Sequence, residues 1–264
     1  MAHMLILGMG YTASRLADRL RAEGWGVTGV RRIADADSIA FDDEDAVRGA
    51  ISRASHILSS VPPQDNGDPV LTRYGATIAA APAQWTGYLS STGVYGDAAG
   101  AWVDEASPVG GGRRSARARA DADWGALRPD MRRFRLPGIY GPGRSALDRV
   151  REGRAHRIDL AGQVFSRVHV DDIAAGIVAS FTGPAGVYNL ADDLPCSQNR
   201  VIEEACALLR QAPPPIVPLE AAGLSPMARA FYAENRRVAN GRAKRLLGWT
   251  PRYPTFAEGL RACL

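Results

Sequence analysis

A glycine-rich turn near the start of the chain constrains the fold more than any other feature. It reads Gly8-Met9-Gly10-Tyr11-Thr12-Ala13 and directly follows the apolar run 4–7. Gly8 permits a sharp turn, Gly10 lets a bound group approach the backbone without a Cβ clash, and Ala13 lets a helix pack closely on the strand. A strand, this turn and an amphipathic helix are typical of a dinucleotide-binding βαβ unit. Gly8, Gly10, Tyr11, Thr12 and Ala13 are therefore the first candidates for cofactor contact.

The chain after this turn alternates between short apolar runs and segments with helical spacing. Strands are expected at 4–7, 25–30, 39–41, 55–61, 86–91 and 131–136, and helices after the turn, at 45–53 and from 68 to 81. Asp68-Pro69 supplies an N-cap followed by proline at the first helical position. Such alternation predicts a parallel sheet with helices on both faces. The predicted fold class is α/β, a doubly wound Rossmann-type sheet.

The pattern changes from about residue 197. A helix is expected over 197–210, a strand at 216–219, and a last helix that opens with the capping box Thr255-Phe256-Ala257-Glu258. These elements predict a small C-terminal lobe over one edge of the sheet. We assign 1–160 mainly to the dinucleotide-binding domain and 161–264 to the last sheet strands and the substrate lobe, with the two interleaved.

The residues after the second expected strand bear on the choice of cofactor. NAD-binding proteins usually place Asp or Glu about 20 residues beyond the glycines, where it binds the ribose 2′-hydroxyl. This chain has Arg31 and Arg32 at that distance. Guanidinium groups suit a 2′-phosphate, so NADP(H) is favoured over NAD(H). The alternative is that both arginines are ordinary surface charge.

Several segments together resemble the extended short-chain dehydrogenase/reductase family, which includes nucleotide-sugar epimerases and dehydratases. Besides the glycine turn they are Leu89-Ser90-Ser91-Thr92-Gly93-Val94-Tyr95-Gly96, Arg135-Leu136-Pro137-Gly138-Ile139-Tyr140-Gly141-Pro142-Gly143, Val168-His169-Val170-Asp171-Asp172, Tyr188-Asn189-Leu190-Ala191 and Leu247-Gly248-Trp249-Thr250-Pro251. They occur in the family's order and span nearly the whole chain. The resemblance implies a nicotinamide dinucleotide on the Rossmann part and a small substrate, such as a sugar nucleotide, under the lobe.

The resemblance also assigns further contacts at strand ends. Asp42 is a candidate for the adenine amine, with a strand-end cap as the alternative. Ser59, Ser60 and Val61 are expected beside the pyrophosphate, chiefly through their backbone. Pro137 begins a loop that the family uses at the nicotinamide end, although glycines and prolines here also suit a simple turn.

Catalysis is expected at the end of the strand 86–91. In the family a Ser or Thr there hydrogen-bonds the reacting oxygen, which implies Ser91, with Thr92 as second choice; the alternative is a hydroxyl that bonds local backbone. The family's acid/base is a tyrosine with a lysine four residues later on one helix face. Alignment places Arg113 and Arg117 at those positions. Arg117 can hold ribose hydroxyls, but a guanidinium does not exchange a proton at neutral pH.

The missing tyrosine–lysine pair leaves three explanations open. Tyr95, Tyr140 or His169 supplies the proton, although each more often has a structural role. Hydride transfer uses a proton from water. Or the protein binds NADP(H) without catalysis, as a sensor. Tyr95, Tyr140, Arg144 and His169 are also the candidate substrate contacts.

Composition weighs against other classes of protein. The net charge is +4, and the densest basic stretch, 113–119, has no aromatic residue for base stacking, so a solvated helix face is expected and not a nucleic-acid site. The histidines, cysteines and paired aspartates lack metal-ligand spacing. No apolar run is long enough for a membrane helix, and no signal peptide is evident. We expect a cytoplasmic protein with reduced thiols. Members of the family often pair through helices beside the active site, so a homodimer is one candidate state and a monomer is the other.

Overall fold

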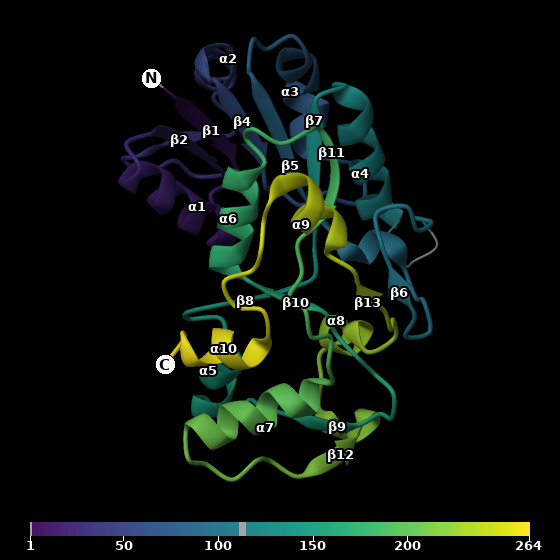
Figure 1. Cartoon of the computed structure of the whole chain (residues 1–264). Helices are drawn as coiled ribbons and strands as arrows, with labels where there is room; N and C mark the ends of the chain where they lie inside the picture. Colours follow the sequence, from purple (N-terminus) through teal and green to yellow (C-terminus); the bar gives the residue numbers. More distant parts are fainter. Residues whose placement is uncertain (1, 111–114) are drawn as a thin grey trace.

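A seven-stranded parallel sheet forms the upper part of the molecule in Figure 1, with strand order β11-β7-β5-β4-β1-β2-β3. The computed structural model describes residues 2–110 and 115–264. The strands are β1 (His3–Leu7), β2 (Gly26–Arg31), β3 (Ser38–Ala40), β4 (His56–Ser59), β5 (Trp85–Ser91), β7 (Met131–Leu136) and β11 (Gly186–Asn189). The order reverses between β1 and β4, which confirms the doubly wound α/β fold.

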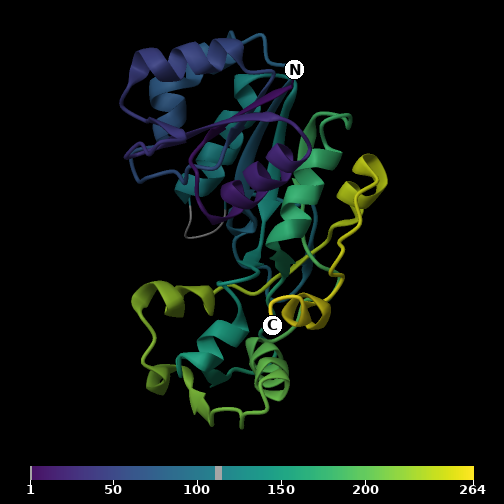
Figure 2. The ribbon, with the colours of Figure 1, turned by 90° about the vertical axis from the view of Figure 1, so that its left-hand side faces the viewer.

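Helices cover both faces of this sheet (Figure 2), so the central strands are apolar on both sides. On one face lie α1 (Tyr11–Ala22) and α6 (Val170–Ala179), and on the other lie α2 (Glu44–Arg53), α3 (Pro69–Ala79) and α4 (Ser115–Leu127). Residues 4–7 of β1 are fully buried between the two layers.

The helices begin and end where local chemistry predicts. The Asp68 carboxylate accepts the backbone N–H groups of Val70 and Leu71 at 2.9 and 3.1 Å, and proline follows at the first helical position of α3. Gly24, with φ of +82°, follows the end of α1. Thr255 and Glu258 form the expected capping box of α10 (Phe256–Arg261). These caps satisfy backbone groups that a helix end leaves unpaired.

A smaller lobe lies below the sheet in Figure 1 and has its own core. The lobe contains α5 (Ala146–Arg151), α7 (Gln198–Leu208), α10 and a two-stranded sheet of β9 (Arg157–Asp159) and β12 (Ile216–Pro218). Helix α7 packs against α5 and α10 through Ile202, Leu147 and Phe256. The expected helix at 197–210 and strand at 216–219 are both present.

The connections between sheet and lobe differ from the expected pattern. The segment 137–143, expected as a loop, contains β8 (Gly138–Tyr140), which pairs with β10 (Arg167–His169). After the lobe elements η2 (Leu219–Ala222) and α8 (Pro226–Phe231), the chain returns to the sheet domain. There β13 (Arg237–Val238) pairs with β6 (Trp102–Val103), and α9 (Gly241–Leu247) packs on β11 and α6. Pairings between segments so far apart leave no local signal in the sequence.

Candidate functional site

The carboxyl ends of the parallel strands bring the expected cofactor residues to one edge of the sheet. Leu7 of β1 pairs with Val30 of β2 and with Ser59 of β4, and Ser59 pairs with Tyr88 of β5. The residues that follow these positions therefore share an edge: Gly8, Arg31, Ser60, Val61 and Ser91. In open α/β sheets, ligands bind in the crevice at this edge, where the strand order reverses.

The glycine turn is held by its two neighbouring strands. The Gly8 and Met9 N–H groups donate to the Val30 carbonyl at 3.0 and 3.3 Å, and the Ser60 hydroxyl donates to the Gly8 carbonyl. Gly8 has φ of +96°, and a Cβ there would lie 2.8 Å from Val61 Cγ2. Only glycine fits this position without strain.

The N-terminus of α1 is open in the way that a diphosphate requires. A Cβ on Gly10 would meet no atom within 4 Å, and the residue is exposed. Within the described residues no side chain caps this 12-residue helix, and its first turn has no acidic residue. The first-turn amides, which include those of Tyr11, Thr12 and Ala13, thus lack a partner from their own helix, and the helix dipole favours an anion there. These residues fit a bound dinucleotide.

Arg31 is not an isolated cation. Its Nε lies 3.2 Å from Asp35 Oδ2. The two line a hollow of about 140 Å³ that Met9 of the glycine turn also lines. Arg32 is exposed beside this pair. Asp42, the candidate for the adenine amine, is exposed and forms an ion pair with Arg73 of α3.

The Ser91 hydroxyl caps a short 3₁₀ helix, η1 (Thr92–Tyr95). Its Oγ accepts the Gly93 N–H at 3.1 Å. Because this bond uses an oxygen lone pair, the hydroxyl proton stays free to donate. Thr92 is buried, and its hydroxyl points at the Leu136 carbonyl at 3.5 Å. Ser91 is the better placed of the two hydroxyls for contact with a bound molecule.

The helix expected to bear Arg113 and Arg117 is α4. Arg117 lies in its first turn and is half-buried, and Arg113 lies outside the described residues. Pro137 follows β7 directly and lies at the same edge of the sheet as Ser91, which pairs with Leu136.

The three other candidate proton donors are buried, and two of them are hydrogen-bonded within the protein. The Tyr95 hydroxyl donates to Asn189 Oδ1 at 2.7 Å and accepts a bond from Arg135 Nη1 at 3.0 Å. Burial raises the pKa of Tyr95, and it also raises the pKa of Tyr140, whose hydroxyl has no partner among the described residues. His169 is buried, its Nδ1 caps α6, and burial lowers its pKa. Tyr95 and His169 thus have partners within the protein, whereas the Tyr140 hydroxyl has none among the described residues.

A contact missed at the level of sequence joins the glycine turn to the lobe. The Tyr11 hydroxyl donates to the Pro142 carbonyl at 3.0 Å, and the Arg144 guanidinium lies over the Tyr11 ring at 5.6 Å from its centroid. Gly143, with φ of +73°, permits the tight turn that presents Arg144. Burial raises the pKa of Tyr11 to about 12, so the phenol stays protonated at neutral pH.

A buried polar network behind Ser91 was also missed. Asp121 of α4 accepts bonds from Arg135 at 2.8 Å, Arg133 at 3.0 Å and the Ser90 hydroxyl at 2.7 Å. Both arginines belong to β7, and charged residues inside a central strand are the signal that could have revealed the network. The network fixes α4 against the strand ends.

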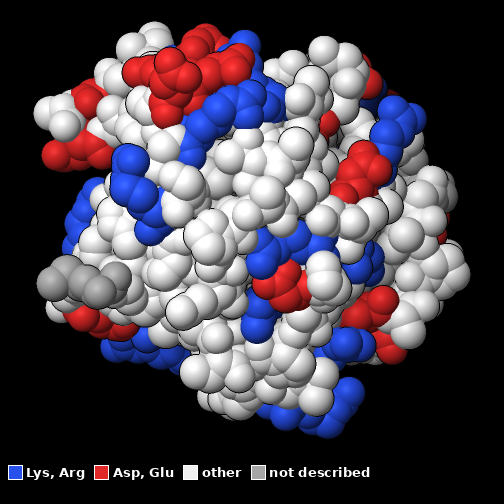
Figure 3. Space-filling model, turned by 90° about the horizontal axis from the view of Figure 1, so that it is seen from above, with Lys and Arg blue, Asp and Glu red and all other residues white. Residues whose placement is uncertain are grey.

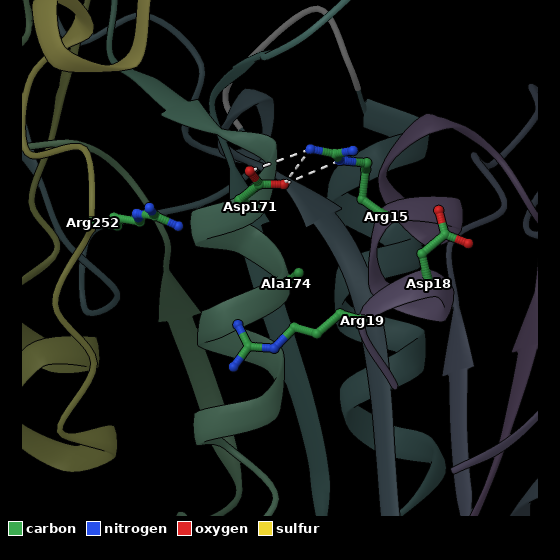
Figure 4. A pocket seen from close by; sticks show the side chains of 6 residues that line it. All are labelled: Arg15, Asp18, Arg19, Asp171, Ala174 and Arg252. Carbon is green, nitrogen blue, oxygen red and sulfur yellow. Dashed lines mark hydrogen bonds and ion pairs between the residues drawn. The ribbon is translucent and has the colours of Figure 1, made fainter. Parts of the chain in front are cut away.

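A second hollow, of about 290 Å³, lies beside α1 and α6 (Figure 4). Arg15 of α1 points across it to Asp171 of α6, with Nη2 and Oδ1 3.0 Å apart. The other lining residues shown are Asp18, Arg19, Ala174 and Arg252. This hollow lies beside the helices that cover one face of the sheet, and Asp18 lines both it and the hollow beside Arg31.

Charge on the molecular surface is mixed. On the end of the molecule away from the lobe, basic and acidic side chains lie interspersed (Figure 3). In residues 2–110 and 115–264, no group of three or more His, Cys, Asp or Glu side chains is arranged to hold a metal ion. No helix in this part of the chain combines the length and apolar character needed to cross a bilayer.

Comparison with known proteins finds a close structural relative of unknown function. A conserved protein from Silicibacter pomeroyi is 40% identical, has a TM-score of 0.92, and the match covers 100% of this chain and 98% of that chain. No family model matches the sequence. The 3-diazoavenalumate denitrifying reductase of a Streptomyces species is 30% identical over 139 residues, which are 48% of this chain and 45% of that protein. The chain thus matches less than half of this reductase.

More distant solved structures share the fold. The human epimerase family protein SDR39U1, solved with NADPH, has a TM-score of 0.79 at 18% identity, and the match covers 98% of each chain. MoeE5, solved with UDP-glucuronic acid and NAD, has a TM-score of 0.77 at 20% identity, and the match covers 99% of this chain and 97% of that one. The neighbours include proteins described as NAD-dependent epimerases and dehydratases.

Proposed function

Because the chain belongs to one family with the Silicibacter pomeroyi protein and has the fold of the extended short-chain dehydrogenases/reductases, we propose that it is an NADP(H)-dependent reductase of a small carbonyl compound. The observation that supports this most is the α1 N-terminus, which combines uncapped amides with open space at Gly10. A diphosphate would accept bonds from these amides. Arg31 and Arg32 would contact a 2′-phosphate at the neighbouring strand end.

The residues of this chain suit a reaction in which the substrate oxygen is held and not deprotonated. A bound nicotinamide would supply hydride. Ser91, whose Oγ already accepts the Gly93 N–H, would donate its own proton in a hydrogen bond to the substrate oxygen and so stabilise negative charge there. Arg117 would hold ribose hydroxyls. Water would supply the proton that completes the reduction.

Reduction is favoured over epimerisation by the state of the titratable groups. Epimerases and dehydratases of this family need a base that removes a proton from the substrate, and an effective base has a pKa near the working pH. Tyr95 and Tyr140 have pKa values raised by burial, and His169 caps a helix. A sugar nucleotide stays a candidate substrate because MoeE5 binds one in its solved structure. The 3-diazoavenalumate denitrifying reductase among the relatives is consistent with a reduction that needs no such base.

The test is calorimetric titration of the wild type and Gly10→Val with NADPH, NADP, NADH and NAD. Gly10 has φ of −95° and no neighbour at its Cβ position, so valine should leave the fold intact while its side chain blocks the diphosphate. We expect wild-type binding with preference for NADPH, and a loss of at least about 100-fold in Gly10→Val, since the close backbone approach is removed.

A control glycine lies far from the turn in α3. A Cβ on Gly75 would make only ordinary contacts of 3.8 Å or more, so Gly75→Ala should bind NADPH like the wild type. Unchanged NADPH affinity in a folded Gly10→Val protein would exclude the proposed diphosphate site.

A non-catalytic NADP(H) sensor is the second candidate. The observation that favours it is that the sequence has no tyrosine between Gly96 and Met131, where the family has its acid/base. A panel of aldehydes, ketones and sugar nucleotides separates the two functions. Substrate-dependent oxidation of NADPH supports the reductase, and NADPH binding without turnover on any member supports the sensor.

A further inference from the structure

An acidic side chain lies against the arginine expected to select NADP(H). The carboxylate of Asp35 is 3.2 Å from the Nε of Arg31. The usual count of about 20 residues from the glycines reaches Arg31 and Arg32 and stops short of this aspartate. The fold nonetheless places Asp35 beside the guanidinium that is expected to contact a 2′-phosphate.

The loop holds Asp35 in a fixed position. Its Oδ1 accepts the Ser38 hydroxyl at 2.6 Å and the Asp37 N–H at 3.2 Å, and the Asp35 N–H donates to Ser38 Oγ at 3.0 Å. Ser38 is the first residue of β3 and pairs with Gly29 of β2. The hydrogen bond from Ser38, with smaller effects from the Asp37 N–H and Arg31, lowers the pKa of Asp35, which keeps it charged at neutral pH.

The hollow beside this pair is not uniformly basic. Three carboxylates, of Asp18, Asp35 and Asp37, and two guanidiniums, of Arg21 and Arg31, line it. A phosphate dianion entering here would gain the attraction of the arginines but would face repulsion from the carboxylates, above all from the one that already pairs with Arg31.

We propose that Asp35 sets the balance between NADPH and NADH in this protein. Its carboxylate competes with a 2′-phosphate for Arg31 and can instead accept a hydrogen bond from a free 2′-hydroxyl. The chain would then use both cofactors, with a modest preference for NADPH. This inference rests on the proposed function and makes a specific statement about the cofactor site.

The experiment compares the ratio of NADPH to NADH affinity in the wild type, Asp35→Asn and the control Asp123→Asn. Asparagine can keep the acceptor for Ser38, while it removes the charge and replaces the oxygen that faces Arg31 with an NH2 group. We expect Asp35→Asn to raise the ratio by about 3- to 10-fold, the scale of one exposed charge interaction. Asp123 is an exposed carboxylate on α4, outside the residues that line the hollow, so the ratio in Asp123→Asn should change by less than about 2-fold.

Salt concentration separates an electrostatic role from a structural role of the loop. The difference between Asp35→Asn and the wild type should shrink at high ionic strength, because screening weakens exposed charge interactions. An unchanged ratio in Asp35→Asn, or equal changes in both variants, would overturn this inference while the wild type still binds NADPH. A wild type that binds none of the four dinucleotides would overturn the proposed function as well.

Discussion

Single side chains determine what chemistry the strand ends can support. Ser91 is the clearest case, because its oxygen is used by the backbone while its proton is free. Tyr95 is the opposite case, because its hydroxyl both donates and accepts within the protein. A residue type alone therefore does not identify a catalytic group, and the partner of each polar atom decides its role.

Ser91→Ala should lower the turnover of any reduction found by about 100-fold with little change in KM, since it removes a donor to charge that develops in the transition state. Loss of the cap on η1 should cost about 1 kcal/mol of stability. Steady-state kinetics with NADPH and thermal unfolding measure the two effects.

Thr92→Val is the comparison for Ser91→Ala. The Thr92 hydroxyl is directed at the Leu136 carbonyl in the buried interior, so its loss should affect stability more than turnover. A larger loss of turnover in Thr92→Val than in Ser91→Ala would assign the donor to Thr92.

The sequence predicts the glycine turn well because its chemistry is local. Gly8 has a positive φ, and Gly10 leaves open space beside the backbone. Glycine is the residue that meets both needs, so the pair of glycines two residues apart is visible in the sequence. Asp35 could not be found in this way. Its contact with Arg31 depends on the path of the loop between β2 and β3. The spacing of residues in the sequence does not predict that path.

At the scale of helices and strands, α4 and β7 are joined by a buried charge network. Asp121 accepts bonds from Arg133 and Arg135, which are on the same face of β7. The carboxylate is almost wholly buried and balances two guanidiniums. Because α4 bears Arg117, this network fixes the position of the helix on which Arg117 lies.

Asp121→Asn should lower the free energy of unfolding by about 3–5 kcal/mol, since it leaves two arginines without their carboxylate. Urea denaturation measures the change. Asp123→Asn, an exposed position on the same helix, should change stability by less than about 0.5 kcal/mol. Similar small effects in both variants would show that the network does not stabilise α4.

Elements with strong local patterns were predicted, and those that depend on distant pairing were not. Strands β1 to β5 and β7 and helices α3, α7 and α10 follow from apolar runs and caps, whereas β11 was not among the strands expected from the sequence. Strand β8 forms because β10 lies beside it. Helix α9 packs on β11 and α6 after the chain has come back from the lobe to the sheet, and no local pattern in the sequence indicates that path.

At the scale of the whole molecule, the junction between sheet and lobe contains a buried carboxyl. Asp192 follows β11, its N–H donates to the Arg167 carbonyl at 2.7 Å, and its Oδ2 has no partner among the described residues. Burial raises the pKa of Asp192 to about 7, although Arg167 opposes the shift. The junction therefore titrates near neutral pH.

Asp192 should make the folded state less stable as pH rises. Between its ordinary value near 4 and its folded pKa of about 7, the folded protein keeps a proton that the unfolded chain loses, so stability falls across this window. Asp192→Asn lacks this titration. Its stability relative to the wild type should rise from pH 4 to 7, by an amount on the order of a few kcal/mol, and then level off.

Urea denaturation at several pH values measures this difference, and Asp193→Asn is the control. Asp193 is the adjacent, more exposed carboxylate and pairs with Lys244 at 2.6 Å. The control should follow the wild-type profile. Parallel profiles for Asp192→Asn and the wild type would show that Asp192 does not titrate in this window.

The return of the chain through β13 and α9 before α10 has a consequence for how proteins of this shape diversify. The lobe is not formed by one continuous segment of the chain, because its helices α5, α7 and α10 are separated in the sequence by elements of the sheet domain. A chimera made with one breakpoint would divide both hydrophobic cores. New substrate preferences should therefore arise by point substitution and loop insertion, and seldom by exchange of the lobe as a block.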